Sequence, residues 1–190
     1  MEAIYEIWAK RNPKFEIRYQ DTIFSVFTDY GKGVSQYQDA RGKIFGAGYE
    51  IYIIAFFIGL YNNQRKPLIE DSAKTKVLGQ PIMYWGNIEE RAGRRAYPKI
   101  REYIFAALVA RTDVDWFALE KGDISARDVV SKLIDTMEEY TNFGLDFIQE
   151  KLEQNPNYFF KETGFLDVFA SFLKQENEDN LVSDEPEDLD

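Results

Sequence analysis

Residues 44–61 read IFGAGYEIYIIAFFIGLY, and this apolar run decides the fold. Apolar side chains occupy nearly every position instead of one stripe, which is typical of a helix that is buried on most sides. The run is almost long enough to span a membrane, but Glu50 lies inside it and Gly46, Gly48 and Gly59 interrupt it. We therefore expect a buried central helix over about 44–61 and no membrane-spanning segment.

The rest of the chain predicts a mainly α, single helical domain around this helix. The 190 residues, of which 45% are hydrophobic and 29% charged, suffice for one domain with a substantial core. Apolar residues recur at spacings of three and four over 99–111, over 126–154 and over 163–173, and Ser125 is a good N-cap for the second of these segments. We place the domain at 1–174.

The N-terminal part contains a different pattern that favours β-structure. Phe15, Ile17 and Tyr19 alternate with polar residues, and the run TIFSVFT at 22–28 follows immediately. Together these segments predict a small N-terminal β-hairpin over residues 15–28. The junction between them lacks the Asn-Gly signal of a tight hairpin turn.

Two residue types are missing, and their absence excludes whole classes of chemistry. The chain has no histidine and no cysteine. It therefore cannot use a Ser-His-Asp triad, a thiol nucleophile, a His- or Cys-ligated metal, a disulfide or an iron–sulfur cluster. We expect no catalytic residues, no metal site and no cofactor, and we expect the protein to be a non-enzyme.

Charge is distributed unevenly along the chain. The formal net charge is -10, but eight of the 33 acidic residues lie in 175–190, which contains no basic residue. Few strong hydrophobes accompany them, so we expect 175–190 to be an acidic, disordered C-terminal tail. Residues 64–101 hold nine basic and four acidic residues, whereas 102–174 hold seven basic and fourteen acidic residues.

The basic segment supplies candidate anion-binding or nucleic-acid-binding residues, namely Arg91, Arg94, Arg95, Lys99 and Arg101. A helix over 88–96 would place the first and third of these arginines on one face. Clustered guanidinium groups beside tyrosines are suited to phosphates and to stacked bases. The alternative is that these residues pair with the acidic half of the same domain.

Glu50 is the one ionisable residue inside the apolar run, and it is a candidate buried acid. An isolated carboxylate there would be costly and would have a raised pKa. We expect it either to lie at the edge of the helix or to pair with Arg94, Arg95 or Arg101. A functional buried acid is the alternative.

These observations rank three hypotheses about function. Aromatic residues make up 16% of the chain, more than a core of this size needs, which favours a surface covered by a protein partner or by a second copy. We expect a non-catalytic helical accessory or adaptor protein acting through protein–protein contacts or self-association. A nucleic-acid-associated protein using the basic 91–101 segment is the first alternative, and a carboxylate- and Mg²⁺-dependent enzyme is the second. Residues 1–6 lack the features of a secretory signal, so we expect a cytoplasmic location.

Overall fold

The computed structural model of the chain is mainly α-helical and describes residues 3–28, 44–87 and 95–183. Its α-helices are, in chain order, α1 (Ile4–Ala9), α2 (Ser25–Phe27), α4 (Gly48–Tyr61), α5 (Ile100–Arg111), α6 (Trp116–Lys121), α7 (Ala126–Gln154) and α8 (Gly164–Ser183). Shorter elements join them: the π-helical turn η1 (Gln20–Phe24), the 3-10 turns η2 (Ser72–Lys74), η3 (Ile82–Tyr84) and η4 (Tyr158–Phe160), and the strands β1 (Lys14–Glu16) and β2 (Thr75–Val77).

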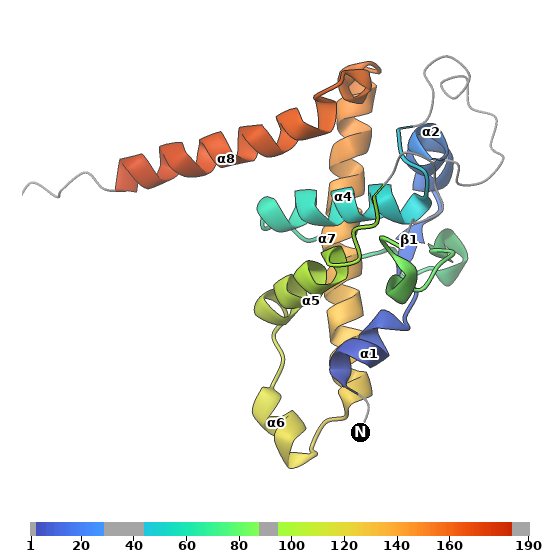
Figure 1. The fold of residues 1–190 in the computed structure, drawn as a ribbon, viewed down its shortest axis with the longest axis vertical. Coiled ribbons are helices and arrows are strands. Elements are labelled where there is room, and N and C mark those ends of the chain that lie inside the picture. Colours follow the sequence, from blue (N-terminus) through green and yellow to red (C-terminus); the bar gives the residue numbers. More distant parts are fainter. Residues whose placement is uncertain (1–2, 29–43, 88–94, 184–190) are drawn as a thin grey trace, which may run out of the picture.

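Helix α4 crosses the long helix α7 at the centre of the molecule (Figure 1). Ten of its fourteen residues are buried, so the prediction of a central core helix is confirmed, although the helix begins at Gly48 instead of residue 44. The crossing is close because each helix presents a glycine to the backbone of the other. A Cβ on Gly59 would lie 2.1 Å from the carbonyl oxygen of Tyr140, and a Cβ on Gly144 would lie 1.9 Å from that of Ala55.

Helix α7 is the longest element, and its start follows from its sequence. The hydroxyl oxygen of Ser125 accepts a hydrogen bond from the backbone N–H of Asp128 at 3.2 Å, and the Asp128 carboxylate accepts one from the Ser125 N–H at 2.9 Å. These bonds satisfy two backbone donors that the first turn of a helix leaves unpaired. The buried side chains recur every three or four residues along the helix, which aligns them on the face that meets α4, α1 and α5.

The small sheet is present, but its strands are not the pair that the sequence predicted. Strand β1 pairs antiparallel with β2, with Lys14 opposite Val77, and residues 20–27 are helical. The hairpin over 15–28 is therefore wrong. The apolar residues of 22–28 enter the core from helical turns, with Ile23, Phe24 and Phe27 fully buried, and so they need no strand partner.

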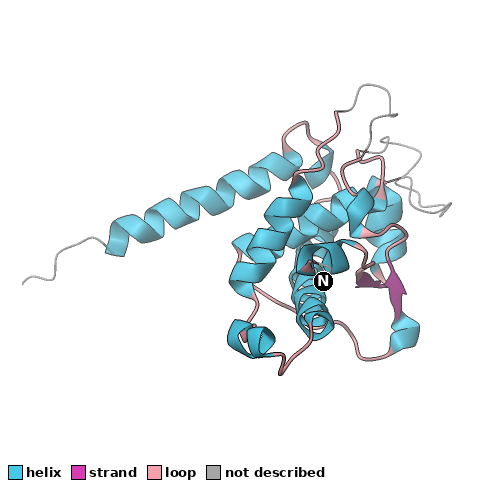
Figure 2. Cartoon of the chain, turned by 60° about the horizontal axis from the view of Figure 1, so that its bottom comes forward, coloured by secondary structure: helices cyan, strands magenta, loops and turns pink. Residues whose placement is uncertain are grey.

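Helix α8 begins beside the end of α7 and projects away from the rest of the molecule (Figures 1 and 2). Its first half packs on the body through ring contacts, such as Phe165 with Phe159 at 4.5 Å between centroids. The helix continues to Ser183, so it does not end at the boundary expected between residues 174 and 175. Residues 184–190 of the predicted acidic tail lie outside the described residues.

The described helices differ in length and apolarity, the two properties that a bilayer-spanning helix needs. Within residues 3–28, 44–87 and 95–183, none of them is both long enough and apolar enough to span a membrane.

Candidate functional site

Most of the helix predicted over 88–96 falls on residues 88–94, which lie outside the described residues, and residues 95–97 are not helical. Arg91 and Arg94 lie outside the described residues. Arg95 is exposed on an extended stretch, and Lys99 is exposed at the N-cap of α5. Because Arg91 lies outside the described residues, its predicted spacing with Arg95 on one helix face stays a prediction.

Arg101 is partly exposed, and its guanidinium group is hydrogen-bonded to backbone carbonyl oxygens. Its Nε donates a hydrogen bond to the carbonyl oxygen of Pro98 at 3.0 Å, and its Nη1 donates one to the carbonyl oxygen of Met83. These bonds join the first turn of α5 to the turn η3. Of the five predicted basic residues, Arg95 and Lys99 are the exposed members within the described part of the chain.

Glu50 is buried in the first turn of α4, which agrees with the expectation that it lies at the edge of the helix. Only 7% of the residue is exposed. Its carboxylate accepts hydrogen bonds from the backbone N–H groups of Gly46 at 2.6 Å and Ala47 at 3.0 Å. A third bond, at 2.9 Å, comes from the hydroxyl of Tyr97. A carboxylate at a helix N-terminus is stabilised by the unpaired N–H groups and by the helix dipole.

The ionisation of Tyr97 reflects this arrangement. Burial and the adjacent Glu50 carboxylate hold the pKa of the Tyr97 hydroxyl well above its ordinary value. The hydroxyl therefore remains a proton donor to Glu50 across the physiological range. Its bond fixes the segment before α5 against the start of α4.

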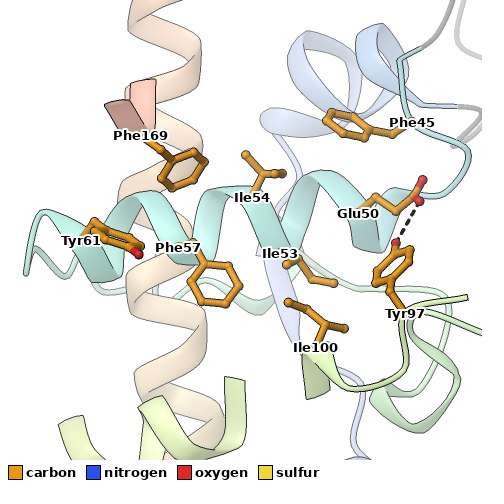
Figure 3. Close-up of a pocket in the computed structure, with 9 residues that line it drawn as sticks. All are labelled: Phe45, Glu50, Ile53, Ile54, Phe57, Tyr61, Tyr97, Ile100 and Phe169. Atoms are coloured by element: carbon orange, nitrogen blue, oxygen red, sulfur yellow. Dashed lines mark hydrogen bonds between the residues drawn. The ribbon is translucent and has the colours of Figure 1, made fainter. Parts of the chain in front are cut away.

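Glu50 and Tyr97 also form the polar end of an open groove along α4 (Figure 3). The groove has a volume of about 450 Å³, and its other lining residues are all apolar or aromatic: Phe45, Ile53, Ile54, Phe57, Tyr61, Ile100 and Phe169. These residues come from α4, from the start of α5, from α8 and from the segment that precedes α4. Phe169 and Tyr61 contact each other at one end of the groove, with their ring centroids 5.7 Å apart.

The groove has the size and the mainly apolar lining that are typical of binding surfaces. A concave, mainly apolar surface with a few polar groups is typical of sites that bind an apolar ligand or side chain. Tyr61 is 54% exposed although it lies against Phe169, so the aromatic lining continues to the rim. Sequence reasoning singled out Glu50 and the aromatic excess, but it did not predict that α8 would complete the groove.

A second polar cluster, which the sequence did not reveal, surrounds Asp146 on α7. Its carboxylate accepts hydrogen bonds from the hydroxyl of Tyr19 at 2.5 Å and from the Lys66 ammonium, and it pairs with the Arg18 guanidinium at 2.8 Å. Burial acts to raise the pKa of Asp146, but these hydrogen bonds and positive charges outweigh burial and hold that pKa below its usual value. Burial and the same carboxylate raise the pKa of the Tyr19 hydroxyl.

The cluster extends through Arg18 to Glu16, which is buried, whereas Asp146 is partly exposed. The Glu16 carboxylate accepts hydrogen bonds from Arg18 Nε at 2.6 Å, from Asn142 Nδ2 at 3.0 Å and from the backbone N–H of Ile69 at 3.1 Å. Glu16 is thus bonded to donors from three separate parts of the chain, and Asp146 to donors from two. This geometry fastens β1 and the 66–69 segment to α7. The signal in the sequence was the pair of polar residues, 142 and 146, on the apolar face of a long helix.

Glu138, one turn before the α4 crossing on α7, is the acid with the most unusual ionisation. Its carboxylate accepts a hydrogen bond from the backbone N–H of Lys14 at 2.7 Å. Burial raises the pKa of Glu138 to about 7, although the bond from Lys14 acts in the opposite direction. The carbonyl oxygen of Lys14 accepts a bond from the Tyr52 hydroxyl at 3.1 Å, so the same residue is held by both α7 and α4.

Within the described ranges, no group of three or more acidic side chains is arranged to hold a metal ion. The groove along α4 is the candidate site, and its lining includes Glu50, the candidate buried acid of the sequence. The chain matches no protein-family model, no curated protein and no solved structure.

Proposed function

We propose that this protein is a non-catalytic helical accessory protein that acts through protein–protein contacts, and that the groove along α4 receives an apolar segment of its partner. The observation that carries this proposal is the open groove of about 450 Å³ whose lining is apolar apart from Glu50 and the tyrosine hydroxyls. An amphipathic helix from the partner is the element best suited to it, because such a helix presents side chains at spacings of three and four to an apolar groove.

The chemistry of the ionisable groups supports this reading over an enzyme. Glu50 is bonded to two backbone N–H groups and to Tyr97, and Asp146 is bonded to three side chains. Carboxylates held in this way stabilise the fold, whereas a general base must be able to approach a substrate proton. The chain also contains no imidazole or thiol that could act in their place.

The test uses one groove variant and one matched control. Tyr61→Glu places a charge at the rim of the groove, and Tyr103→Glu places the same charge on α5 at a residue that is 65% exposed and does not line the groove. Proteins captured from cell extract by the native chain are identified, purified and titrated against all three forms. We expect Tyr61→Glu to weaken the binding of the true partner at least tenfold and Tyr103→Glu to leave it within a factor of two. Equal affinities for all three forms would overturn the assignment of the groove.

The nucleic-acid hypothesis remains the alternative, because Arg95 and Lys99 are exposed. It predicts that labelled single- or double-stranded oligonucleotides bind the full chain at low salt, that binding weakens steeply as salt rises, and that the double substitution Arg95→Glu and Lys99→Glu reduces it. Absence of binding at low salt would remove this alternative and leave the protein-contact proposal.

A further inference from the structure

Helix α8 carries apolar residues on two different faces. The inner face packs on the body: Val168 is buried, Phe165 contacts Phe159, and Phe172 contacts Phe147 with ring centroids 6.0 Å apart. The outer face is exposed. Leu166 is 68% exposed and Leu173 is 51% exposed.

The outer face has the spacing of a helix–helix contact. Leu166, Ala170 and Leu173 stand at positions i, i+4 and i+7, so they share one side of the helix, and Ala170 is exposed between the two leucines. This spacing is the repeat of apolar residues in helices that pair side by side. The small side chain of Ala170 permits a second helix to approach closely.

We propose that this outer face pairs with the same face of a second copy of the chain, the two α8 helices running antiparallel about a twofold axis near Ala170. Residues 166–174 read LDVFASFLK. The exposed Leu166 is followed by the negatively charged Asp167, and the exposed Leu173 is followed by the positively charged Lys174. Both charged residues are exposed.

Charge complementarity selects the second copy and the antiparallel direction. A twofold axis near Ala170 brings Leu166 of one copy opposite Leu173 of the other. The same axis brings Asp167 of one copy near Lys174 of the other, and symmetry repeats this ion pair, so two equivalent ion pairs flank the apolar contact. In a parallel pair Asp167 would lie beside Asp167 of the other copy and Lys174 beside Lys174 of the other copy, so like charges would face each other. The C-terminal parts of the two α8 helices, whose sequence contains Glu176, Glu178 and Asp179, would then also run side by side.

The direction of α8 leaves room for this pairing. In Figure 1 the helix projects from the end of α7, away from α1, α5 and α6. A contact of about two turns on each side is smaller than the interfaces of about 1,600 Å² in stable complexes, so the dimer forms only at high protein concentration.

The experiment is analytical ultracentrifugation of the full chain over a wide range of concentration. We expect the average mass to rise from 22.2 kDa toward twice that value. Leu173→Glu should keep the chain monomeric throughout the range. Ser171→Glu, a substitution on the same helix but away from the outer face, should dimerise like the native chain. Circular dichroism of each variant checks that α8 and the rest of the fold are retained.

A charge exchange tests the direction of the pair. Asp167→Lys alone and Lys174→Glu alone should each weaken dimerisation at least fivefold, and the two substitutions together should restore it. A chain that stays monomeric at every concentration would overturn the proposal, as would a dimer that Leu173→Glu leaves intact or that the charge exchange does not restore. Because the groove variant Tyr61→Glu leaves the outer face unchanged, loss of partner binding and loss of dimerisation are separate results.

Discussion

Gly144 in α7 lies directly against the backbone of Ala55 in α4, so closely that a Cβ at position 144 would stand 1.9 Å from the Ala55 carbonyl oxygen. Gly59 makes the reciprocal approach to Tyr140 from α4. These two contacts set the distance between the two helices that supply about half of the buried core residues. The groove lies along α4, so its shape depends on this crossing.

The first prediction concerns this crossing. Gly144→Ala should lower the free energy of unfolding by about 3 kcal/mol, because the added methyl meets backbone atoms that cannot move aside like a flexible side chain. Gly79→Ala is the matched control, since a Cβ there meets nothing within 4 Å, and it should change stability by less than about 0.5 kcal/mol. Urea unfolding followed by circular dichroism measures both. Equal stability of the two variants would contradict the close crossing.

The second prediction concerns the pH dependence of stability through Glu138. Its pKa is about 7 in the folded protein and 4.5 for an ordinary glutamate, so the folded state binds more protons than the unfolded state between these values. Glu138 therefore makes stability fall as the pH rises from about 4.5 through about 7. Glu138→Gln keeps an oxygen that can accept the Lys14 hydrogen bond and removes the charge. It should stabilise the protein at pH 8, by about 3 kcal/mol at most, and much less at pH 5.

Unfolding free energies of the native chain and Glu138→Gln, measured from pH 5 to pH 8, check this sign. Glu150→Gln, at an exposed position of the same helix, is the control for the chemical change itself. A difference between native and Glu138→Gln that stays constant across this range would show that Glu138 does not titrate as described.

The third prediction concerns the hydrogen bond between Glu50 and Tyr97. Glu50→Gln and Tyr97→Phe should each lower stability by about 1–2 kcal/mol, because each leaves a partly buried polar group without its charged or hydroxyl partner. The double variant should cost less than the sum, with a coupling energy of about 1 kcal/mol. Chemical unfolding of the four forms measures the coupling, and Tyr103→Phe, at an exposed position of α5, is the control for losing a hydroxyl. Strict additivity would mean that the bond contributes nothing.

The fourth prediction separates the basic residues by their roles. Arg101→Ala should lower the free energy of unfolding by about 1 kcal/mol, because the carbonyl groups of Pro98 and Met83 lose their donor. Arg95→Ala and Lys99→Ala should each change it by less than about 0.5 kcal/mol, since both side chains are exposed. Thermal and urea unfolding compare the three variants. A neutral Arg101→Ala would contradict the internal role.

The helical class of the fold was predictable because its strongest signals are local. The run over 44–61 contains its own evidence of burial, and the Ser125 cap with the period of apolar residues marks α7. The strand pairing was not predictable, because β1 pairs with a strand about sixty residues further along the chain. An alternating pattern indicates a strand but does not indicate which segment pairs with it.

The candidate site was predictable only in part, for the same reason. Glu50 stood out because an acid in an apolar run is unusual, and its position at the helix edge was expected. Tyr97 as its partner, and Phe169 as a wall of the groove, come from segments that only the tertiary structure brings together. The cluster around Asp146 likewise joins residues from β1, the 66–69 segment and α7.

The most direct test of the central claim places a photo-reactive phenylalanine analogue at the position of Tyr61, and separately at the position of Tyr103, in the full chain inside cells that express it naturally. Our account predicts that irradiation joins the chain at position 61 to a discrete protein, and that position 103 gives no such product. A product at position 61 that contains nucleic acid, or no product at that position, would contradict a protein-binding groove along α4.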